Sequence, residues 1–194
     1  MPITGRSPYG IPAINSSSAS GGSAEQGCAA EPDRERSCDM KVRDVMATVV
    51  HSCHPHTNLA EAAESMWNFD CGSLPVVDHD GKVIGMITDR DICMAVATKG
   101  RTASYITVWE TMTGKAYTCA EDDDARAALR TMATEKVRRL PVVDQGSMLR
   151  GVLSINDLVL QAGEAKWKGA QALSCEEVLD TLKKICGHRV LVGI

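Results

Sequence analysis

The sequence has few aromatic residues and no excess of positive charge. Phe, Trp and Tyr make up 4% of its 194 residues, so a hydrophobic core has to be built from aliphatic side chains. Lysine and arginine total 21 against 25 acidic residues, which gives a formal net charge of −4. Extensive nucleic-acid binding needs many cations to neutralise phosphates. The composition therefore predicts no nucleic acid as a partner.

Long apolar runs and enzyme motifs are also missing. No stretch approaches the ~20 apolar residues that cross a bilayer, and the first residues lack the basic-then-apolar pattern of a signal peptide. We therefore expect a cytoplasmic protein with no membrane partner, whose eight cysteines stay mostly reduced. The sequence contains no P-loop, zincin pattern, nucleophile motif or dinucleotide glycine fingerprint. It predicts no catalytic residues and no enzyme.

The N-terminal part is poor in large aliphatic residues. Residues 1–40 include the segment SSSASGGS and cannot bury enough apolar surface to offset the entropy lost on ordering. We expect a disordered tail here. A targeting peptide is the functional alternative.

From residue 42 onward the sequence repeats itself. Residues 74–78 (LPVVD) return at 140–144, and residues 42–46 (VRDVM) return at 108–112 as VWETM, both at an offset of 66. A constant offset without a gap indicates two copies of one structural unit. The sequence predicts two pseudo-symmetric domains, residues 41–100 and 101–161.

Each copy has the same predicted order of elements: strand, helix, strand, strand, helix. Short extended segments come first, at 49–52 and 116–118. A helical stripe follows in the first copy, formed by Leu59, Ala62, Ala63 and Met66. A hairpin and a second helix come next, with Ile92, Ala95 and Val96 expected to face inward. The predicted fold class is α+β, with an additional C-terminal helix.

Residues 162–194 form this C-terminal extension. Ser174 and Glu177 make a capping box that predicts a helix start, and Gly187 is a plausible helix stop. The predicted apolar stripe consists of Val178, Leu179, Leu182, Ile185 and Cys186. We expect this helix to serve packing or dimer contact.

The most informative motif occurs once in each copy, at residues 85–91 and 151–157. It reads glycine, two apolar residues, a hydroxyl residue, two variable residues and aspartate. The hydroxyl residue, Thr88 or Ser154, ends a strand and caps a helix whose first amides favour an anion. The aspartate, Asp91 or Asp157, can accept two hydrogen bonds from a ribose diol. The same spacing also fits a capping box that needs no ligand, and both interpretations stay open.

The double repeat, with LPVVD, a hairpin and then G-x-x-[ST]-x-x-D, resembles tandem cystathionine-β-synthase (CBS) domains, the Bateman module, in a stand-alone bacterial-type form. The resemblance implies two domains packed sheet to sheet, modules that dimerise, and clefts that bind AMP, ADP, ATP, NAD or S-adenosylmethionine. It implies no required cofactor; the adenosyl ligand is an effector. It places ribose on Asp91 and Asp157, and Thr88 and Ser154 near ribose or phosphate. The segments ending the first strands would line the base, with His51, Cys53, Tyr117 and Cys119.

The two copies differ in charge before the LPVVD segment. Lys136, Arg138 and Arg139 precede the second LPVVD, where the first copy has Asp70, Gly72 and Ser73. The resemblance implies that such basic residues meet phosphate, whereas the alternative is a solvated strand edge. We expect unequal occupancy, with the weaker site belonging to the first copy.

Other clusters are interpreted as structural. Residues 51–56 (HSCHPH) are rich in metal donors, but the second copy keeps only the cysteine, so no metal site is predicted. Residues 121–124 are acidic and are expected to begin a helix. Trp67, Trp109 and Trp167 are expected to pack in a core or an interface.

The sequence thus predicts a non-catalytic regulatory module. An adenosine-containing ligand between the copies would favour one domain orientation, which a homodimer or an unknown effector protein would read out. Two alternatives remain open. One is a metal- or redox-responsive protein that uses residues 51–56 and free thiols, and the other is a ligand-free structural interaction module.

Overall fold

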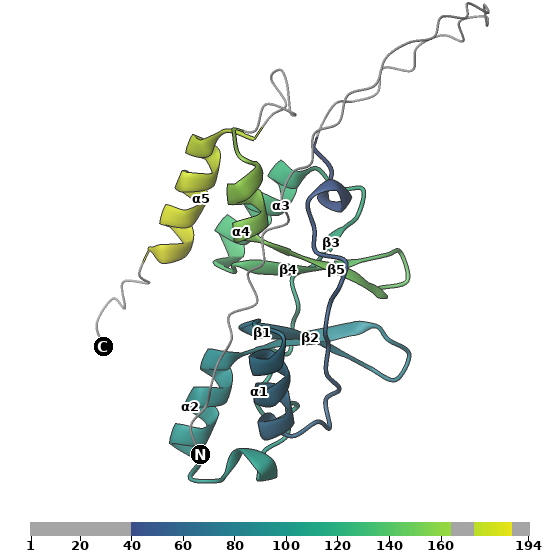
Figure 1. Cartoon of the computed structure of the whole chain (residues 1–194), viewed down its shortest axis with the longest axis vertical. Coiled ribbons are helices and arrows are strands. Elements are labelled where there is room, and N and C mark those ends of the chain that lie inside the picture. The colour runs from purple at the N-terminus through teal and green to yellow at the C-terminus, as the bar shows by residue number, and fades with distance from the viewer. Residues whose placement is uncertain (1–39, 164–172, 188–194) are drawn as a thin grey trace, which may run out of the picture. The chain divides into compact units, whose positions relative to one another are not determined.

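The computed structural model describes residues 40–163 and 173–187 (Figure 1). The predictions for residues 1–39 and for Trp167 lie outside these ranges. No helix in the described part of the chain is long and apolar enough to cross a membrane.

Two small sheets reproduce the repeat. The first pairs β1 (Ser73–Val77) with β2 (Val83–Thr88) in antiparallel fashion. The second pairs β4 (Arg139–Val143) with β5 (Leu149–Ser154), with the short strand β3 (Cys119–Ala120) parallel to β4. Both hairpins have the same register and the same irregularity one residue before the end of the first strand. The offset of 66 residues is therefore also an offset in structure.

The two sheets meet at their hairpin turns. The amide of Val83 donates to the carbonyl of Ser147 at 3.0 Å, and the amide of Leu149 donates to the carbonyl of Gly81. The helices lie on the outer faces of the two sheets (Figure 1). This is the expected sheet-to-sheet arrangement of an α+β pair.

The leading strand of each copy is shorter and later than predicted. In the first copy it is a single parallel bridge between Cys53 and Val76, and in the second it is β3. A turn follows directly in both copies. It is closed by a hydrogen bond from the Thr57 amide to the His54 carbonyl in the first copy, and from the Asp123 amide to the Ala120 carbonyl in the second. These turns limit each strand to one or two paired residues.

The helices begin at polar capping residues. They are α1 (Leu59–Asn68), α2 (Asp89–Lys99), α3 (Ala125–Glu135), α4 (Ile155–Gln161) and α5 (Cys175–Cys186). Their N-cap side chains are Asn58, Thr88, Asp124, Ser154 and Ser174, each accepting a backbone N–H of the first turn. The acidic run at 121–124 is therefore a helix start, as predicted. Gly187 ends α5 without entering the left-handed region.

The core divides into two aliphatic clusters, one behind each sheet. The segment leading each copy contributes to the cluster of the other copy. Met40 and Val42 are buried in the second cluster, whereas Ile106 and Val108 are buried in the first. The backbone pairing shows the same exchange, because Ala47 forms a β-bridge to strand β5 and Thr113 forms one to strand β2. Each sheet is thus completed by chain that comes from the other copy.

This exchange explains the motif glycines. A Cβ on Gly85 would lie 2.6 Å from the carbonyl oxygen of Thr113, and a Cβ on Gly151 would lie 2.8 Å from that of Ala47. Glycine leaves room for the crossing backbone at both positions.

Several predictions of burial are wrong. Val96 is 39% exposed and Leu179 is 51% exposed, because each lies at the margin of its helical stripe, beyond the covering element. Cys186 is exposed as well. Trp67 and Trp109 are 80% and 63% exposed and lie outside the aliphatic core, which leaves an interface as their expected role.

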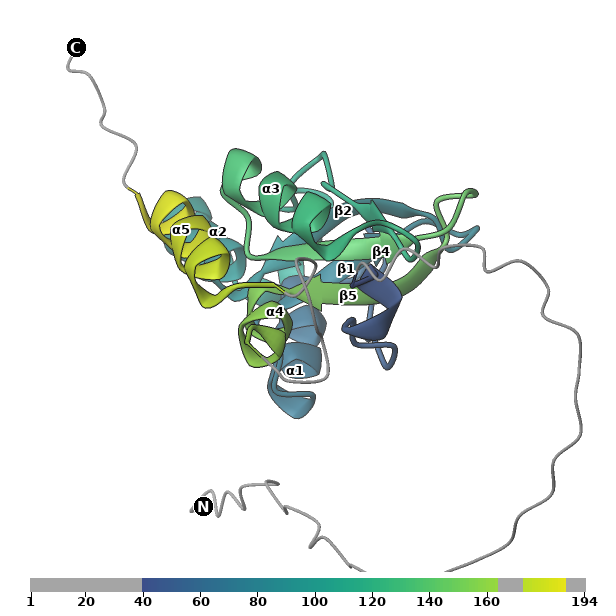
Figure 2. The ribbon, with the colours of Figure 1, turned by 90° about the horizontal axis from the view of Figure 1, so that it is seen from above.

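Helix α5 packs against α3 and α4 in the second repeat (Figure 2). Its residues Val178 and Thr181 are buried, and Leu182 and Ile185 pack against the second cluster. Leu173, just before the helix, is 1% exposed. Leu173 and helix α5 are therefore an integral part of the second core.

Candidate functional site: two pockets between the repeats

The larger candidate site is a cavity of about 690 Å³ beside the first motif, which we call the Thr88 pocket. The first repeat contributes Gly72, Ser73, Met86, Thr88, Asp89 and Arg90. The second repeat contributes Thr113, Gly114, Lys115, Ala116, Tyr117, Lys136, Val137, Arg138 and Arg139. The pocket is therefore built by both copies.

A smaller cavity of about 240 Å³ lies beside the second motif, and we call it the Ser154 pocket. Its walls come from Ala47, Val49, Val50, His51, Phe69, Asp70, Cys71, Ser73, Pro75, Arg139, Val152, Ser154 and Asp157. The two pockets correspond at the repeat offset: Ser154 takes the place of Thr88, and His51 that of Tyr117. The two pockets are therefore equivalent positions in the two repeats.

The basic residues lie beside the first motif, at Thr88, and not beside the second motif, at Ser154, as expected. Lys136 and Arg138 line the Thr88 pocket, although they belong to the second copy. Of the three predicted cations, only Arg139 also lines the Ser154 pocket. The physical reason is that each motif faces the residues that lead into the first hairpin strand, β1 or β4, of the opposite repeat. The pocket beside the first motif, expected to lack cationic residues, is therefore the one that they line.

Thr88 and Asp91 form a tight pair at the start of α2. Asp91 Oδ2 accepts the Thr88 amide at 3.0 Å and the Thr88 hydroxyl at 2.7 Å. The Asp91 amide donates to Thr88 Oγ1 at 3.2 Å. Thr88 lines the pocket, whereas Asp91 stands behind it and fixes its side chain. Both of the hydrogen bonds that Asp91 accepts from Thr88 end on Oδ2.

Ser154 and Asp157 repeat this arrangement at the start of α4. Asp157 Oδ2 accepts the Ser154 amide at 2.8 Å, and the Asp157 amide donates to Ser154 Oγ at 3.3 Å. Here both residues line the pocket. The capping box is thus real in both repeats. It occupies one carboxylate oxygen and is compatible with a ligand on the other.

The charges around the two pockets differ strongly. The Thr88 pocket is lined by five cationic residues, Arg90, Lys115, Lys136, Arg138 and Arg139, and by one acid, Asp89. The Lys115 ammonium also lies 5.0 Å from the ring centroid of Tyr117. Such a set of donors suits an anion with several oxygens.

The Ser154 pocket is less basic and partly filled. Its lining contains Arg139, together with the acids Asp70 and Asp157. The His51 ring stacks on the Phe69 ring, with centroids 3.3 Å apart and planes inclined by 10°. Aromatic surface that a planar base would need is therefore already covered.

The predicted cysteines do not reach either site. Cys53 and Cys119 are each 7% exposed and belong to the two cores, outside the pocket linings. Burial raises the pKa of Cys53 to about 11 and that of Cys119 to about 12, with the Asp123 carboxylate adding to the second shift. Thiols held protonated in this way are poor nucleophiles and poor metal ligands at neutral pH.

The histidine-rich segment gives no ready-made metal centre. His54 Nδ1 lies 3.1 Å from the carbonyl oxygen of Val77, and the His79 ring lies 6.1 Å from the His54 ring. His51 faces the other way, toward Phe69. Within residues 40–163 and 173–187, no group of three or more His, Cys, Asp or Glu residues is disposed to hold a metal ion.

Three charged residues in the wall of the Thr88 pocket were not predicted from the sequence. Arg90 and Asp89 occupy the variable positions of the motif, and Lys115 lies in the crossing segment. The variable positions carried no signal in themselves. Lys115 follows the repeated segment at 108–112, so its nearness to the first motif depends on the exchange of segments.

The comparisons with known proteins agree with this architecture. The family model of the CBS domain matches residues 42–98 and 106–162. This chain belongs to the CBS domain family. The CBS domain-containing protein YhcV of Bacillus subtilis is 34% identical over 123 residues, which cover 61% of this chain and 83% of that protein.

Two solved structures of CBS pairs contain ligands. The CBS domain pair of protein MJ0100, solved with 5-methylthioadenosine and S-adenosyl-L-methionine, is 27% identical with a TM-score of 0.58. The alignment covers 63% of this chain and 94% of that one. CBSX2 in complex with AMP is 27% identical with a TM-score of 0.54, covering 62% and 93% of the two chains. CBS pairs related to this chain thus bind adenosine-containing molecules.

Proposed function

We propose that this chain is a non-catalytic regulatory module that binds a phosphorylated adenosine ligand, such as AMP, ADP or ATP, in the Thr88 pocket. The observation that carries the proposal is the convergence of Lys115, Lys136 and Arg138 with Thr88 around one cavity of about 690 Å³. The related CBS pairs with bound AMP or S-adenosyl-L-methionine support the adenosine part.

Charge distinguishes the candidate ligands. Phosphate groups gain from the five cationic residues of the Thr88 pocket. S-adenosylmethionine carries a positive sulfonium and would be repelled there. We expect affinity to rise from AMP to ADP to ATP. The ribose would bind beside Thr88, whose hydroxyl group Asp91 holds in place, and the base near Tyr117.

We propose that the Ser154 pocket binds the ligand more weakly than the Thr88 pocket. Its acids Asp70 and Asp157 oppose phosphate, and the stack of His51 on Phe69 has to open before a base enters. Occupancy is therefore unequal, but in the order opposite to the sequence-based expectation. Ligand in the Thr88 pocket would bias the relative orientation of the two repeats.

Calorimetric titration with ATP tests the proposal. The change Arg138→Gln removes one charged donor and should weaken ATP binding roughly 10- to 100-fold, the range for hydrogen bonds to charged groups. Arg130→Gln is the matched control, because Arg130 lies on α3 outside both pockets. The proposal fails if ATP produces no binding heat, or if both variants bind like the unchanged protein.

The proposed readout includes a homodimer and an effector protein. The exposed Trp67 and Met94 lie on the helices of the first repeat, which α5 does not cover. We propose this face for self-association. Light scattering of the Trp67→Lys variant should give a monomer mass where the unchanged protein gives a dimer, and an unaltered mass would contradict the assignment.

A further inference from the structure

One lysine connects the Thr88 pocket to the C-terminal helix. Lys136 lines the pocket, and its ammonium donates to the carbonyl oxygen of Gly187 at 3.1 Å. Gly187 is the C-cap residue of α5. A side chain of the candidate ligand site is therefore also part of the attachment of α5.

The position of Lys136 in the backbone directs it to both places. It is the C-cap of α3 and adopts a left-handed conformation, with φ of +55°. The chain turns sharply there from α3 toward β4, which starts at Arg139. The lysine thus stands at the junction of the helix layer and the pocket wall.

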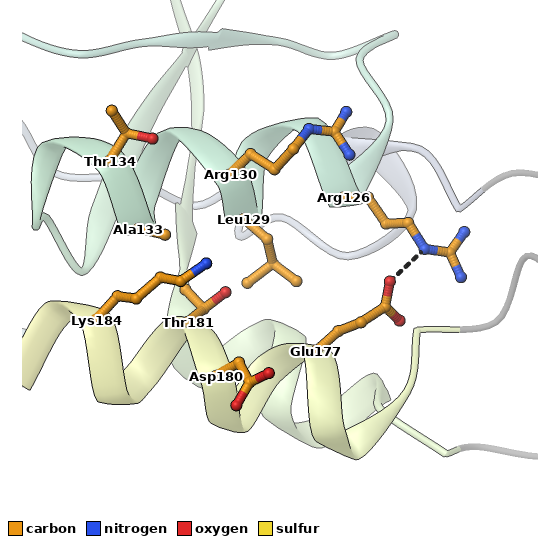
Figure 3. A pocket seen from close by; sticks show the side chains of 9 residues that line it. All are labelled: Arg126, Leu129, Arg130, Ala133, Thr134, Glu177, Asp180, Thr181 and Lys184. Carbon is orange, nitrogen blue, oxygen red and sulfur yellow. Dashed lines mark hydrogen bonds and ion pairs between the residues drawn. The ribbon is translucent and has the colours of Figure 1, made fainter.

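The other end of α5 is held independently of the pocket. Arg126 Nε on α3 lies 2.9 Å from Glu177 Oε1 on α5, as Figure 3 shows. Leu173 is fully buried before the helix, and Val178 follows in the same core. The first half of α5 therefore stays seated if the last turn is released.

The contact between α5 and α3 is not closely packed along its whole length. A cavity of about 470 Å³ lies between the two helices, lined by Leu129, Ala133 and Thr134 of α3 and by Asp180, Thr181 and Lys184 of α5, among others (Figure 3). In the last turn of α5, Lys184 borders this cavity, and Ile185 is the residue that packs against the second cluster. The Lys136 hydrogen bond is correspondingly important to this turn.

A phosphate competes for the same ammonium. The end of a helix offers about half a negative charge, because its last carbonyls have no partner in the helix. A nucleotide phosphate offers a full charge or more, surrounded by Arg138 and Arg139. The stronger acceptor draws the lysine away from Gly187.

We propose that phosphate binding in the Thr88 pocket withdraws Lys136 from Gly187 and loosens the last turn of α5. This inference rests on the proposed function, and it names how occupancy of that site is transmitted. The signal would be a helix end that is capped without ligand and uncapped with ligand. By linkage, a variant that loses the bond to Gly187 no longer couples α5 to the pocket.

Hydrogen exchange followed by mass spectrometry of the full chain tests this mechanism, with ATP as the probe. We expect ATP to accelerate exchange in the last turn of α5 about two- to tenfold, the effect of one hydrogen bond. Lys136→Asn should show fast exchange there without ATP and no further response. Asparagine suits the left-handed backbone and removes the ammonium. Lys115→Asn is the control, since it alters the pocket and should leave exchange in ligand-free α5 unchanged.

The outcomes separate the two proposals. ATP binding by calorimetry without any change in α5 exchange overturns the inference and leaves the proposed function intact. Slower exchange of α5 with ATP, or unchanged basal exchange in Lys136→Asn, also overturns it. Absence of ATP binding refutes the proposed function and this inference together.

Discussion

The two repeats share a backbone but differ in what covers their helices. In the second repeat, α5 packs over the surface formed by Leu129, Met132 and Leu158. At the repeat offset, the first repeat has Ala63, Met66 and Ile92, and these line an open cavity of about 440 Å³. The C-terminal extension therefore occupies in one repeat a surface that the other leaves open.

The pockets differ in the same way. Their geometry is related by the offset, yet one gathers five cationic residues and the other holds an aromatic stack. The repeated backbone forms both pockets, and the side chains that are not repeated give them different charge. The proposed difference in ligand binding rests on these side chains.

The largest expected difference is in core stability. Leu158→Ala should destabilise the fold by about 4 kcal/mol, because Leu158 is fully buried among α4, β5 and α5. Ile92→Ala, at the equivalent position, should cost about 2 kcal/mol, because no fifth helix covers it. Urea denaturation measures both. Equal losses would show that α5 adds little to the second core.

The motif glycines should instead behave alike. Gly85→Ala and Gly151→Ala each place a Cβ within 3 Å of a crossing backbone carbonyl and should cost about 1–3 kcal/mol. Gly114→Ala is the control, because an added Cβ there meets nothing within 4 Å. Thermal unfolding gives the comparison. If either motif variant has the same unfolding temperature as the control, the crossing segment does not stabilise that repeat.

The capping aspartates should separate stability from binding. Asp91→Asn and Asp157→Asn each weaken a capping box and should lower stability by about 1 kcal/mol. We expect only Asp91→Asn to weaken ATP binding as well, by tenfold or more. Calorimetry on both variants decides this. Weaker ATP binding by Asp157→Asn alone would assign the nucleotide to the other pocket.

The smallest effect concerns pH and α5. The Ser174 amide, and then the Arg126 side chain, lower the pKa of Glu177 despite partial desolvation. A carboxylate with a lowered pKa in the folded state stabilises it above the unfolded value, and this contribution is lost as the pH falls through the folded value. The NMR signal of the Arg126 Nε–H group, which donates to Glu177, should therefore respond to acid only below the ordinary glutamate pKa of about 4.5. Glu177→Gln should lose this response, and a response that persists would place its origin elsewhere.

Much of this fold could be predicted from periodicity. The offset of 66 located both hairpins, and the capping residues Thr88, Ser154 and Ser174 marked real helix starts. The exchange of leading segments could not be predicted, because repeats that pack within or across copies have the same sequence. It was equally unpredictable that each motif faces the start of the first hairpin strand of the opposite repeat, which places Lys136 and Arg138 beside Thr88.

Burial at the edges of helices was also beyond the sequence. Val96 and Leu179 fit an apolar stripe, yet whether a margin is covered depends on the neighbouring element. The stacking of His51 on Phe69 likewise depends on two loops meeting in space. The candidate site residues were thus found mostly as a set, while their distribution between the pockets required the structure.

A crystal structure of the full chain grown with saturating ATP tests the central claim most directly. The account predicts one well-ordered nucleotide per chain, in the Thr88 pocket, with its phosphates among Lys136, Arg138 and Arg139. It also predicts that the His51 ring remains stacked on Phe69. Phosphates found in the Ser154 pocket, or a Thr88 pocket without nucleotide at saturation, would contradict it.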